Sequence, residues 1–349
     1  MLDGTMNEKS TQEVGYTIDQ LLNKSQELID GGEYELALQF CVRAHEMDDQ
    51  NTRALLQAAT VQLEIGDIEP AYNKCVELEP DTGYIKYLYL GQLSGELEAV
   101  KYFEKGLEIM YKELEAAKPG SDEARDLRRK ISEAHISITE IYLTDCCYEP
   151  DAEKQCETNL DKAIAVDPEC PDAHQTYASV KLSQQRIEEA KQCLEKSISL
   201  WKDLEPGHPN IPSYDSRLTL VRLHLECQLY EKALDLLETL QKENDESVDL
   251  WYLYGWTYFL RGDSKDVSTE EKSDAWNEAR DCLERALALA ATREYDDSAL
   301  TEHARELVEK INTQVPRREG DDEEEVVPTG DEKGEWEDID TEDEMEVVS

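Results

Sequence analysis

The residues best suited to chemistry are aromatic and acidic side chains in the last third of the chain. Tyr252 and Trp256 are four residues apart, so on a helix they share one face, and Asp249 precedes them by about one turn. An aromatic ring attracts a cation over its face, and a carboxylate pairs with the same cation. This combination predicts recognition of lysine and arginine side chains on an extended peptide.

Further polar side chains share one property with this group. They lie on the first helix of a predicted helical hairpin, outside the face that packs between hairpins. The candidate partner-binding residues are therefore Gln92, Glu140, Asp145, Ser179, Arg222, Glu226, Asp249, Tyr252 and Trp256. Each acid could equally be an ordinary solvated charge, and the two rings could instead fill space between hairpins. Trp251, Tyr254 and Tyr258 already occupy that packing face, which favours a binding role for Tyr252 and Trp256.

The sequence contains no pattern that predicts catalysis. A glycine-rich phosphate loop and the G-x-S-x-G nucleophile motif are both missing from it. The six histidines are scattered, no Cys-x-x-Cys is present, and carboxylates are too numerous for any pair to be informative. We therefore expect a protein that is not an enzyme and has no catalytic residue, no cofactor and no metal site.

The element that must position Tyr252 and Trp256 is a helical hairpin over residues 251–286. Its first helix reads Trp-Tyr-Leu-Tyr-Gly-Trp-Thr-Tyr, and its second helix carries Ala279-x3-Leu283-x2-Ala286. This spacing resembles the tetratricopeptide repeat, in which small residues let the two helices approach closely. The sequence therefore predicts a close contact between the two helices at Gly255.

The same hairpin departs from the repeat in its length. Residues 263–274 are an insert between the two helices. Within the insert, Ser268-x-x-Glu271 is a capping box, a pattern in which each residue satisfies the other's backbone N–H at a helix start. The second helix is therefore expected to begin early and to be longer than usual.

Similar patterns recur from Thr17-x-x-Gln20, a second capping box, to a final amphipathic segment at 297–314. They predict an all-α fold, a right-handed tetratricopeptide superhelix of about seven hairpins plus a capping helix, with one concave and one convex side. The expected organisation is a flexible N-terminus (1–15), a repeat solenoid (16–315) and an acidic disordered tail (316–349).

The charge balance of the chain is extreme, with 36 basic and 81 acidic residues and a net charge of −45. Residues 319–349 contribute −15 of this, so the remaining 318 residues still carry −30. Such a chain repels phosphate backbones and attracts basic partners over a long range. We therefore expect a basic protein partner and no direct contact with nucleic acid.

The sequence also bears on the compartment. The N-terminus lacks the basic-then-apolar pattern of a signal peptide, and the longest apolar run, Ala286–Ala291, is far shorter than the ~20 residues of a membrane span. We expect no membrane association, nine reduced cysteines and a monomer.

Several segments resemble one family more narrowly than the general repeat does. They are Tyr87–Gly95, Ile141–Glu153, Ala178–Arg186 and Leu250–Trp256, and together with the acidic C-terminus they are similar to the dedicated assembly chaperones of large-subunit ribosomal protein four. The resemblance covers about 80–315 well and the first two repeats loosely. It implies a superhelical protein that captures the newly made ribosomal protein and clamps its long basic internal loop on the concave surface. It also implies escort to nuclear pre-ribosomes, and hence a cytoplasmic and nuclear location.

Two other functions stay open at this point. The chain could be a scaffold subunit of a larger complex, or a co-chaperone adaptor that grips an acidic C-terminus through a two-carboxylate clamp. The clamp needs Lys and Asn on adjacent first helices, whereas the corresponding pairs here are Leu22/Gln26 and Leu56/Thr60. Those side chains cannot hold a carboxylate, which disfavours the adaptor.

Overall fold

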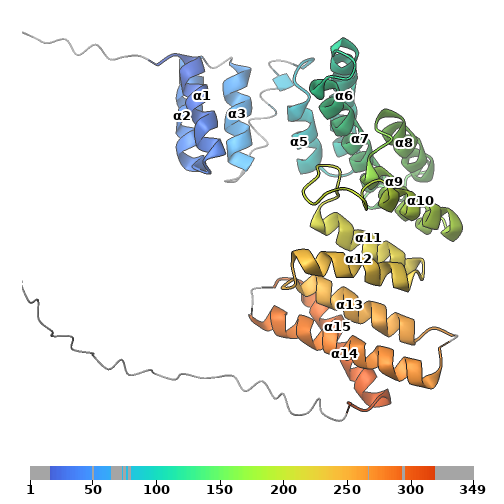
Figure 1. Cartoon of the computed structure of the whole chain (residues 1–349). Helices are drawn as coiled ribbons and strands as arrows, with labels where there is room; N and C mark the ends of the chain where they lie inside the picture. Colours follow the sequence, from blue (N-terminus) through green and yellow to red (C-terminus); the bar gives the residue numbers. More distant parts are fainter. Residues whose placement is uncertain are drawn as a thin grey trace, which may run out of the picture. The chain divides into compact units, whose positions relative to one another are not determined.

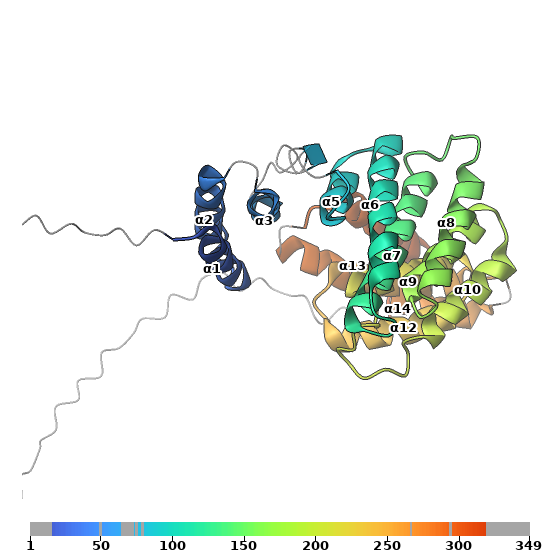
Figure 2. The same cartoon turned by 90° about the horizontal axis from the view of Figure 1, so that it is seen from above.

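The computed structural model describes residues 16–48, 51–63, 73, 76–77, 80–265, 267–292 and 295–318, and over these residues it contains helices and no strand (Figure 1; Figure 2). The expected all-α class is confirmed. The predicted N-terminus at 1–15, most of the second helix of hairpin two and the tail at 319–349 lie outside the described residues.

The chain divides into two compact units, Met1–Asp245 and Glu246–Ser349. The first unit contains α1 (Ile18–Asp30), α2 (Tyr34–Met47), α3 (Thr52–Leu63), α5 (Ile85–Leu93), α6 (Glu96–Ala116), α7 (Asp122–Leu143), α8 (Ala152–Val166), α9 (Pro171–Ser183), α10 (Ile187–Ser199), α11 (Tyr214–Glu226) and α12 (Tyr230–Glu243). The second unit contains α13 (Val248–Gly262), α14 (Thr269–Thr292) and α15 (Ser298–Gln314). The expectation that 16–315 behaves as one array stays a prediction.

Local sequence signals set the helix starts. The Thr17 hydroxyl accepts the Gln20 N–H at 3.3 Å, and the Gln20 side chain accepts the Thr17 N–H at 2.9 Å. The same reciprocal pair joins Ser268 and Glu271 before α14, at 3.3 and 2.9 Å. Both predicted capping boxes are confirmed, and α14 is accordingly extended toward its N-terminus to a length of 24 residues.

In the first unit, α7 contacts α9, and α9 contacts α11. Helix α8 packs against α7 and α9, and α10 packs against α9 and α11.

A chain of hydrogen-bonded polar side chains joins α6, α7 and α8. The Tyr111 hydroxyl on α6 lies 3.1 Å from His135 Nε2 on α7, and His135 Nδ1 lies 2.8 Å from Asn159 Oδ1 on α8. A neutral imidazole with its proton on Nδ1 satisfies both bonds. Burial lowers the pKa of His135 to about 4, which favours that neutral form.

In the second unit, α13 and α14 form the hairpin predicted from the sequence, and α15 packs against both. A Cβ added to Gly255 would lie 2.5 Å from Leu283 Cγ and 3.0 Å from the Ala279 carbonyl oxygen. The expected close approach at Gly255 is thus confirmed. The Trp276 ring stacks on Phe259 at 4.9 Å and donates its N–H to the Phe259 carbonyl at 3.1 Å.

Candidate partner-binding surface

Three neighbouring helices of the first unit present parallel rows of polar side chains to solvent. In each row the residues are spaced i, i+4, i+7 and i+11, which places them on one helical face. We call these rows together the α7–α9–α11 stripe. It consists of Glu133, Ser137 and Glu140 on α7 with Thr144 at its C-cap, Asp172, Thr176, Ser179 and Ser183 on α9, and Asp215, Thr219, Arg222 and Glu226 on α11. All twelve side chains are exposed or half-buried.

The stripe is acidic, with five carboxylates and one guanidinium, Arg222. Glu133 is in an ion pair of 3.1 Å with Arg129, but among the described residues no basic side chain pairs with Glu140. Glu140 keeps access to solvent, yet the surrounding protein partly desolvates its carboxylate, and Asp172 adds a like charge. Both effects raise the pKa of Glu140. An incoming cation would offset both effects by stabilising the charged carboxylates, so Glu140 and Asp172 are matched to a lysine or arginine side chain.

Hydrogen bonds fix the α9 row against the α11 row. The Ser216 hydroxyl donates to Asp172 Oδ1 at 2.6 Å, and the buried Gln175 amide donates to the Ser216 carbonyl at 2.9 Å. The buried Gln175 side chain therefore links α9 to α11, and the Ser216 hydroxyl holds the half-buried Asp172 carboxylate in place. The carboxylate keeps its second oxygen for a ligand.

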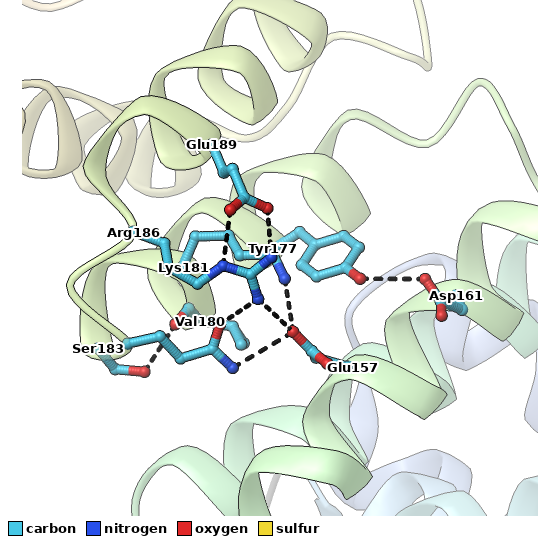
Figure 3. A network of polar contacts seen from close by, with 9 residues as sticks. Glu157, Asp161, Tyr177, Val180, Lys181, Ser183, Arg186 and Glu189 are labelled. Carbon is cyan, nitrogen blue, oxygen red and sulfur yellow. Dashed lines mark hydrogen bonds and ion pairs between the residues drawn. The ribbon is translucent and has the colours of Figure 1, made fainter.

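The opposite face of α9 is held by an ion cluster that Figure 3 shows from close by. Lys181 is nine residues after Asp172 and so faces about the other way around the helix. Its ammonium is 2.5 Å from Glu157 Oε1 on α8 and 4.6 Å from the centre of the Tyr177 ring. Arg186 donates to the same Glu157 oxygen at 2.9 Å and also pairs with Glu189 on α10.

This cluster, Glu157, Lys181, Arg186 and Glu189, joins α8, α9 and α10 around one carboxylate. Hydrogen bonds from Lys181, Gln184 and Arg186 hold the pKa of Glu157 below its usual range. Because Lys181 is only 6% exposed, its charge needs that partner. The cluster fixes the rotation of α9 and thereby the direction in which Asp172, Thr176 and Ser179 point.

The structure brings some predicted residues together and leaves others apart. Glu140, Ser179 and Glu226 all lie in the stripe, as does Arg222. Gln92 is exposed on α5, outside the three helices, and Asp145 is exposed in the turn that follows α7.

The remaining predicted residues, Asp249, Tyr252 and Trp256, lie on α13 in the second unit. Tyr252 was expected to point away from neighbouring helices, but it is only 8% exposed, and its hydroxyl lies 2.8 Å from His303 Nδ1 on α15. The ring is thus covered by the capping helix. Trp256 is half-buried, with its ring edge-on to His303 at 5.9 Å, and Asp249 accepts a hydrogen bond of 2.9 Å from the Tyr295 hydroxyl.

Sequence reasoning missed the other eight residues of the stripe, which are Glu133, Ser137, Thr144, Asp172, Thr176, Ser183, Asp215 and Thr219. The signal that could have found Asp172 and Thr176 is their spacing from Ser179 along one helix face, seven and three residues before it. It also missed the roles of Lys181 and Arg186, although both lie in the segment Ala178–Arg186 that carried the family resemblance.

Metal sites and membrane-spanning helices are the remaining classes to consider for the described residues. No group of His, Cys, Asp and Glu among them is arranged to hold a metal ion. None of the helices they form combines the length and hydropathy that crossing a membrane requires.

Comparison with known proteins places this geometry in a family. A tetratricopeptide repeat model matches residues 171–201, which contain α9 and α10. A Schizosaccharomyces pombe protein named "Probable assembly chaperone of rpl4" is 33% identical over 317 residues, covering 87% of this chain and 90% of that protein. The chain belongs to the family of assembly chaperones of rpl4. An Emericella nidulans protein of the same name is 31% identical over 360 residues, covering 94% of this chain and 90% of its own length.

Solved structures agree with the family assignment. The structure titled "Assembly Chaperone of RpL4 (Acl4) (Residues 1-338)" matches with a TM-score of 0.67 and 32% identity, over 71% of this chain and 97% of that chain. A tetratricopeptide repeat protein from Parabacteroides merdae matches with a TM-score of 0.52 at 14% identity, over 85% of this chain and all of that one. The second match supports the fold alone, whereas the first confirms the resemblance to the chaperones noted in the sequence.

Proposed function

We propose that this chain is a dedicated chaperone that binds newly made ribosomal protein L4 and escorts it to nuclear pre-ribosomes. Membership of the rpl4 chaperone family supports the identity of the client. The observation that carries the binding mode is the acidic α7–α9–α11 stripe, in which partial desolvation of Glu140 and the nearby charge of Asp172 raise the pKa of Glu140. Such a chaperone acts by binding, is expected in both cytoplasm and nucleus, and needs no cofactor.

In the proposed complex, a basic internal loop of the client lies across the stripe. Exposed ion pairs contribute only ~0–1 kcal/mol each, so one pair would not suffice. Glu140, Asp172, Asp215 and Glu226 offer several pairs on a fixed frame, and the hydroxyls of Thr176, Ser179 and Thr219 add hydrogen bonds. Because the frame is rigid, little ordering of the chaperone opposes binding.

The second unit offers a smaller surface of the same chemistry. The Trp256 ring is half-buried and edge-on to His303, and a cation placed over its face would contribute roughly 0.5–2 kcal/mol. Cation–π contacts depend less on screening than exposed ion pairs do, so we propose that Trp256 supports binding at low and at high salt.

The test is a pull-down of ribosomal protein L4, full-length and without its internal loop, over a series of salt concentrations. We expect full-length client to be captured with an affinity that falls as salt rises, and the loop-deleted client to be captured far less. Equal capture of the two clients would place binding elsewhere on the chain.

The same experiment separates the alternative functions. Leu22, at a position where the carboxylate clamp of an adaptor needs a polar side chain, is 1% exposed and cannot contact a ligand. A scaffold subunit would co-purify with a constant set of partners that survives high salt, and would not require L4.

A further inference from the structure

Trp201, just after α10, separates two cavities that the stripe does not use. The smaller, of about 420 Å³, lies between α10 and α12; the larger, of about 780 Å³, lies beneath the loop 204–212. Both are in the size range of sites that hold small ligands or peptide side chains. Trp201 lines both cavities, as do Lys202 and Thr239. None of the stripe residues lines either one.

Trp201 contains a buried hydrogen-bond donor that has no acceptor in the described part of the chain. The side chain is only 7% exposed, and its indole N–H has no acceptor among the residues that the structure describes. A buried donor without a partner costs about 1–3 kcal/mol, so such groups normally find one. Trp276, by contrast, donates its buried N–H to the Phe259 carbonyl at 3.1 Å. An acceptor brought by a ligand would satisfy the donor at Trp201.

The walls of the two cavities define what would fit. Ile198 and Leu236 give the smaller cavity an apolar part, and the charged side chains of Glu195, Lys232 and Asp235 also line it. The larger cavity has apolar walls from the loop 204–212, but it also receives three cationic side chains, Lys202, Arg217 and Lys242.

One acid, Glu243, lines the larger cavity, and both its oxygens accept from Arg217, at 2.5 and 2.7 Å. Lys242 pairs with Glu238 outside it, at 3.1 Å. Lys202 has no ion pair within the described part of the chain. With Arg217 and Lys242 each paired to a glutamate, the charge that the larger cavity offers a ligand is that of Lys202.

We propose that the two cavities around Trp201 form a second docking site, which takes a partner peptide with an apolar side chain followed by a carboxylate. The apolar side chain enters the smaller cavity against Ile198 and Leu236. The carboxylate enters the larger one beside Lys202, and an oxygen of the peptide accepts the Trp201 N–H. This ligand is acidic, whereas the client bound by the stripe is basic, so the two do not compete for one site. The chaperone could therefore bind its client and an acidic partner at the same time.

The experiment titrates the full-length protein, labelled with ¹⁵N, with the peptide acetyl-Gly-Leu-Glu-Glu-Leu-Gly-amide and follows the indole N–H signals. A Trp201→Phe variant assigns the Trp201 signal. Acetyl-Gly-Gly-Leu with a free C-terminus tests whether a terminal carboxylate replaces the acidic side chain, and acetyl-Gly-Leu-Lys-Lys-Leu-Gly-amide is the basic control.

We expect at least one of the two acidic peptides to shift the Trp201 signal saturably, and the lysine peptide to leave it unchanged. Lys202→Glu should weaken binding about tenfold or more, the change that corresponds to about 1.4 kcal/mol. Lys196→Glu is an equal charge reversal on α10, six residues before Lys202, at a residue that lines neither cavity, and it should change binding less than twofold. The proposal is overturned if no acidic peptide moves the signal at millimolar concentration, or if the two reversals weaken binding equally. Neither result bears on capture of L4 by the stripe.

Discussion

Lys181 on α9 and Glu157 on α8 form an ion pair of 2.5 Å in which the two partners differ greatly in burial. The lysine side chain is 7% exposed and the glutamate side chain 34%. Glu157 therefore keeps contact with water if its partner is lost, whereas Lys181 does not. Leaving the lysine without its partner therefore costs more free energy than leaving the glutamate without its partner.

This asymmetry predicts unequal effects of two substitutions. Glu157→Gln leaves a buried ammonium without its carboxylate and should lower the free energy of unfolding by about 2 kcal/mol, less than for a fully buried pair because Glu157 is partly solvated. Lys181→Met fills the same space with an apolar chain and should cost under about 1 kcal/mol. Urea unfolding of both variants checks this, and a larger loss for Lys181→Met would contradict the assigned role.

A second prediction concerns the close contact between α13 and α14. Gly255→Ala would place a Cβ 2.5 Å from Leu283 Cγ and 3.0 Å from the backbone oxygen of Ala279. Because the backbone cannot yield cheaply, we expect destabilisation of about 1–3 kcal/mol. Gly95→Ala is the matched control, since a Cβ there meets no atom within 4 Å. Thermal unfolding that is equally affected by both would argue against the tight contact.

The buried histidine on α7 predicts a dependence of stability on pH. His135 has a pKa of about 4 in the folded chain, below the ordinary value of 6.5, because burial disfavours its charged form. The unfolded chain therefore binds a proton first as the pH falls. Stability from this group is full above pH 6.5, decreases between 6.5 and about 4, and changes no further below. The total is at most roughly 3 kcal/mol.

The measurement is urea unfolding at several pH values for the natural chain and for His135→Gln, which has no titratable group at that position. The variant should lose part of the slope between pH 6.5 and 4, while His174 and His224, whose pKa values burial also lowers, retain their share. Parallel slopes in the two proteins would show that His135 has the same pKa in the folded and unfolded chains, and would contradict its burial as a neutral imidazole.

The elements of the fold could be predicted from sequence because their signals are either short-range or fixed by the spacing of a repeat. Capping boxes at Thr17 and Ser268 span three residues. Gly255 contacts Leu283, 28 positions later, but the tetratricopeptide pattern determines which residue types meet within a hairpin, and this contact is present in the structure.

The site was only partly predictable because its geometry depends on distant partners. Tyr252 was assigned to an open face, but His303, 51 residues later, covers it. The direction of the α9 row depends on Glu157, which is 24 residues before Lys181. Helical spacing shows which residues share a face, but it does not show which helix will cover that face.

The affinity of the chain for ribosomal protein L4 after charge reversal in the stripe tests the central claim most directly. We would measure the dissociation constant at low and high salt for the double variant Glu140→Lys with Glu226→Lys. The matched control is Glu188→Lys with Glu238→Lys, which makes the same change in net charge on α10 and α12. The account predicts about hundredfold weaker binding for the stripe variant at low salt, a smaller loss at high salt, and less than about threefold for the control. Equal weakening by both variants, or unchanged binding by a correctly folded stripe variant, would contradict it.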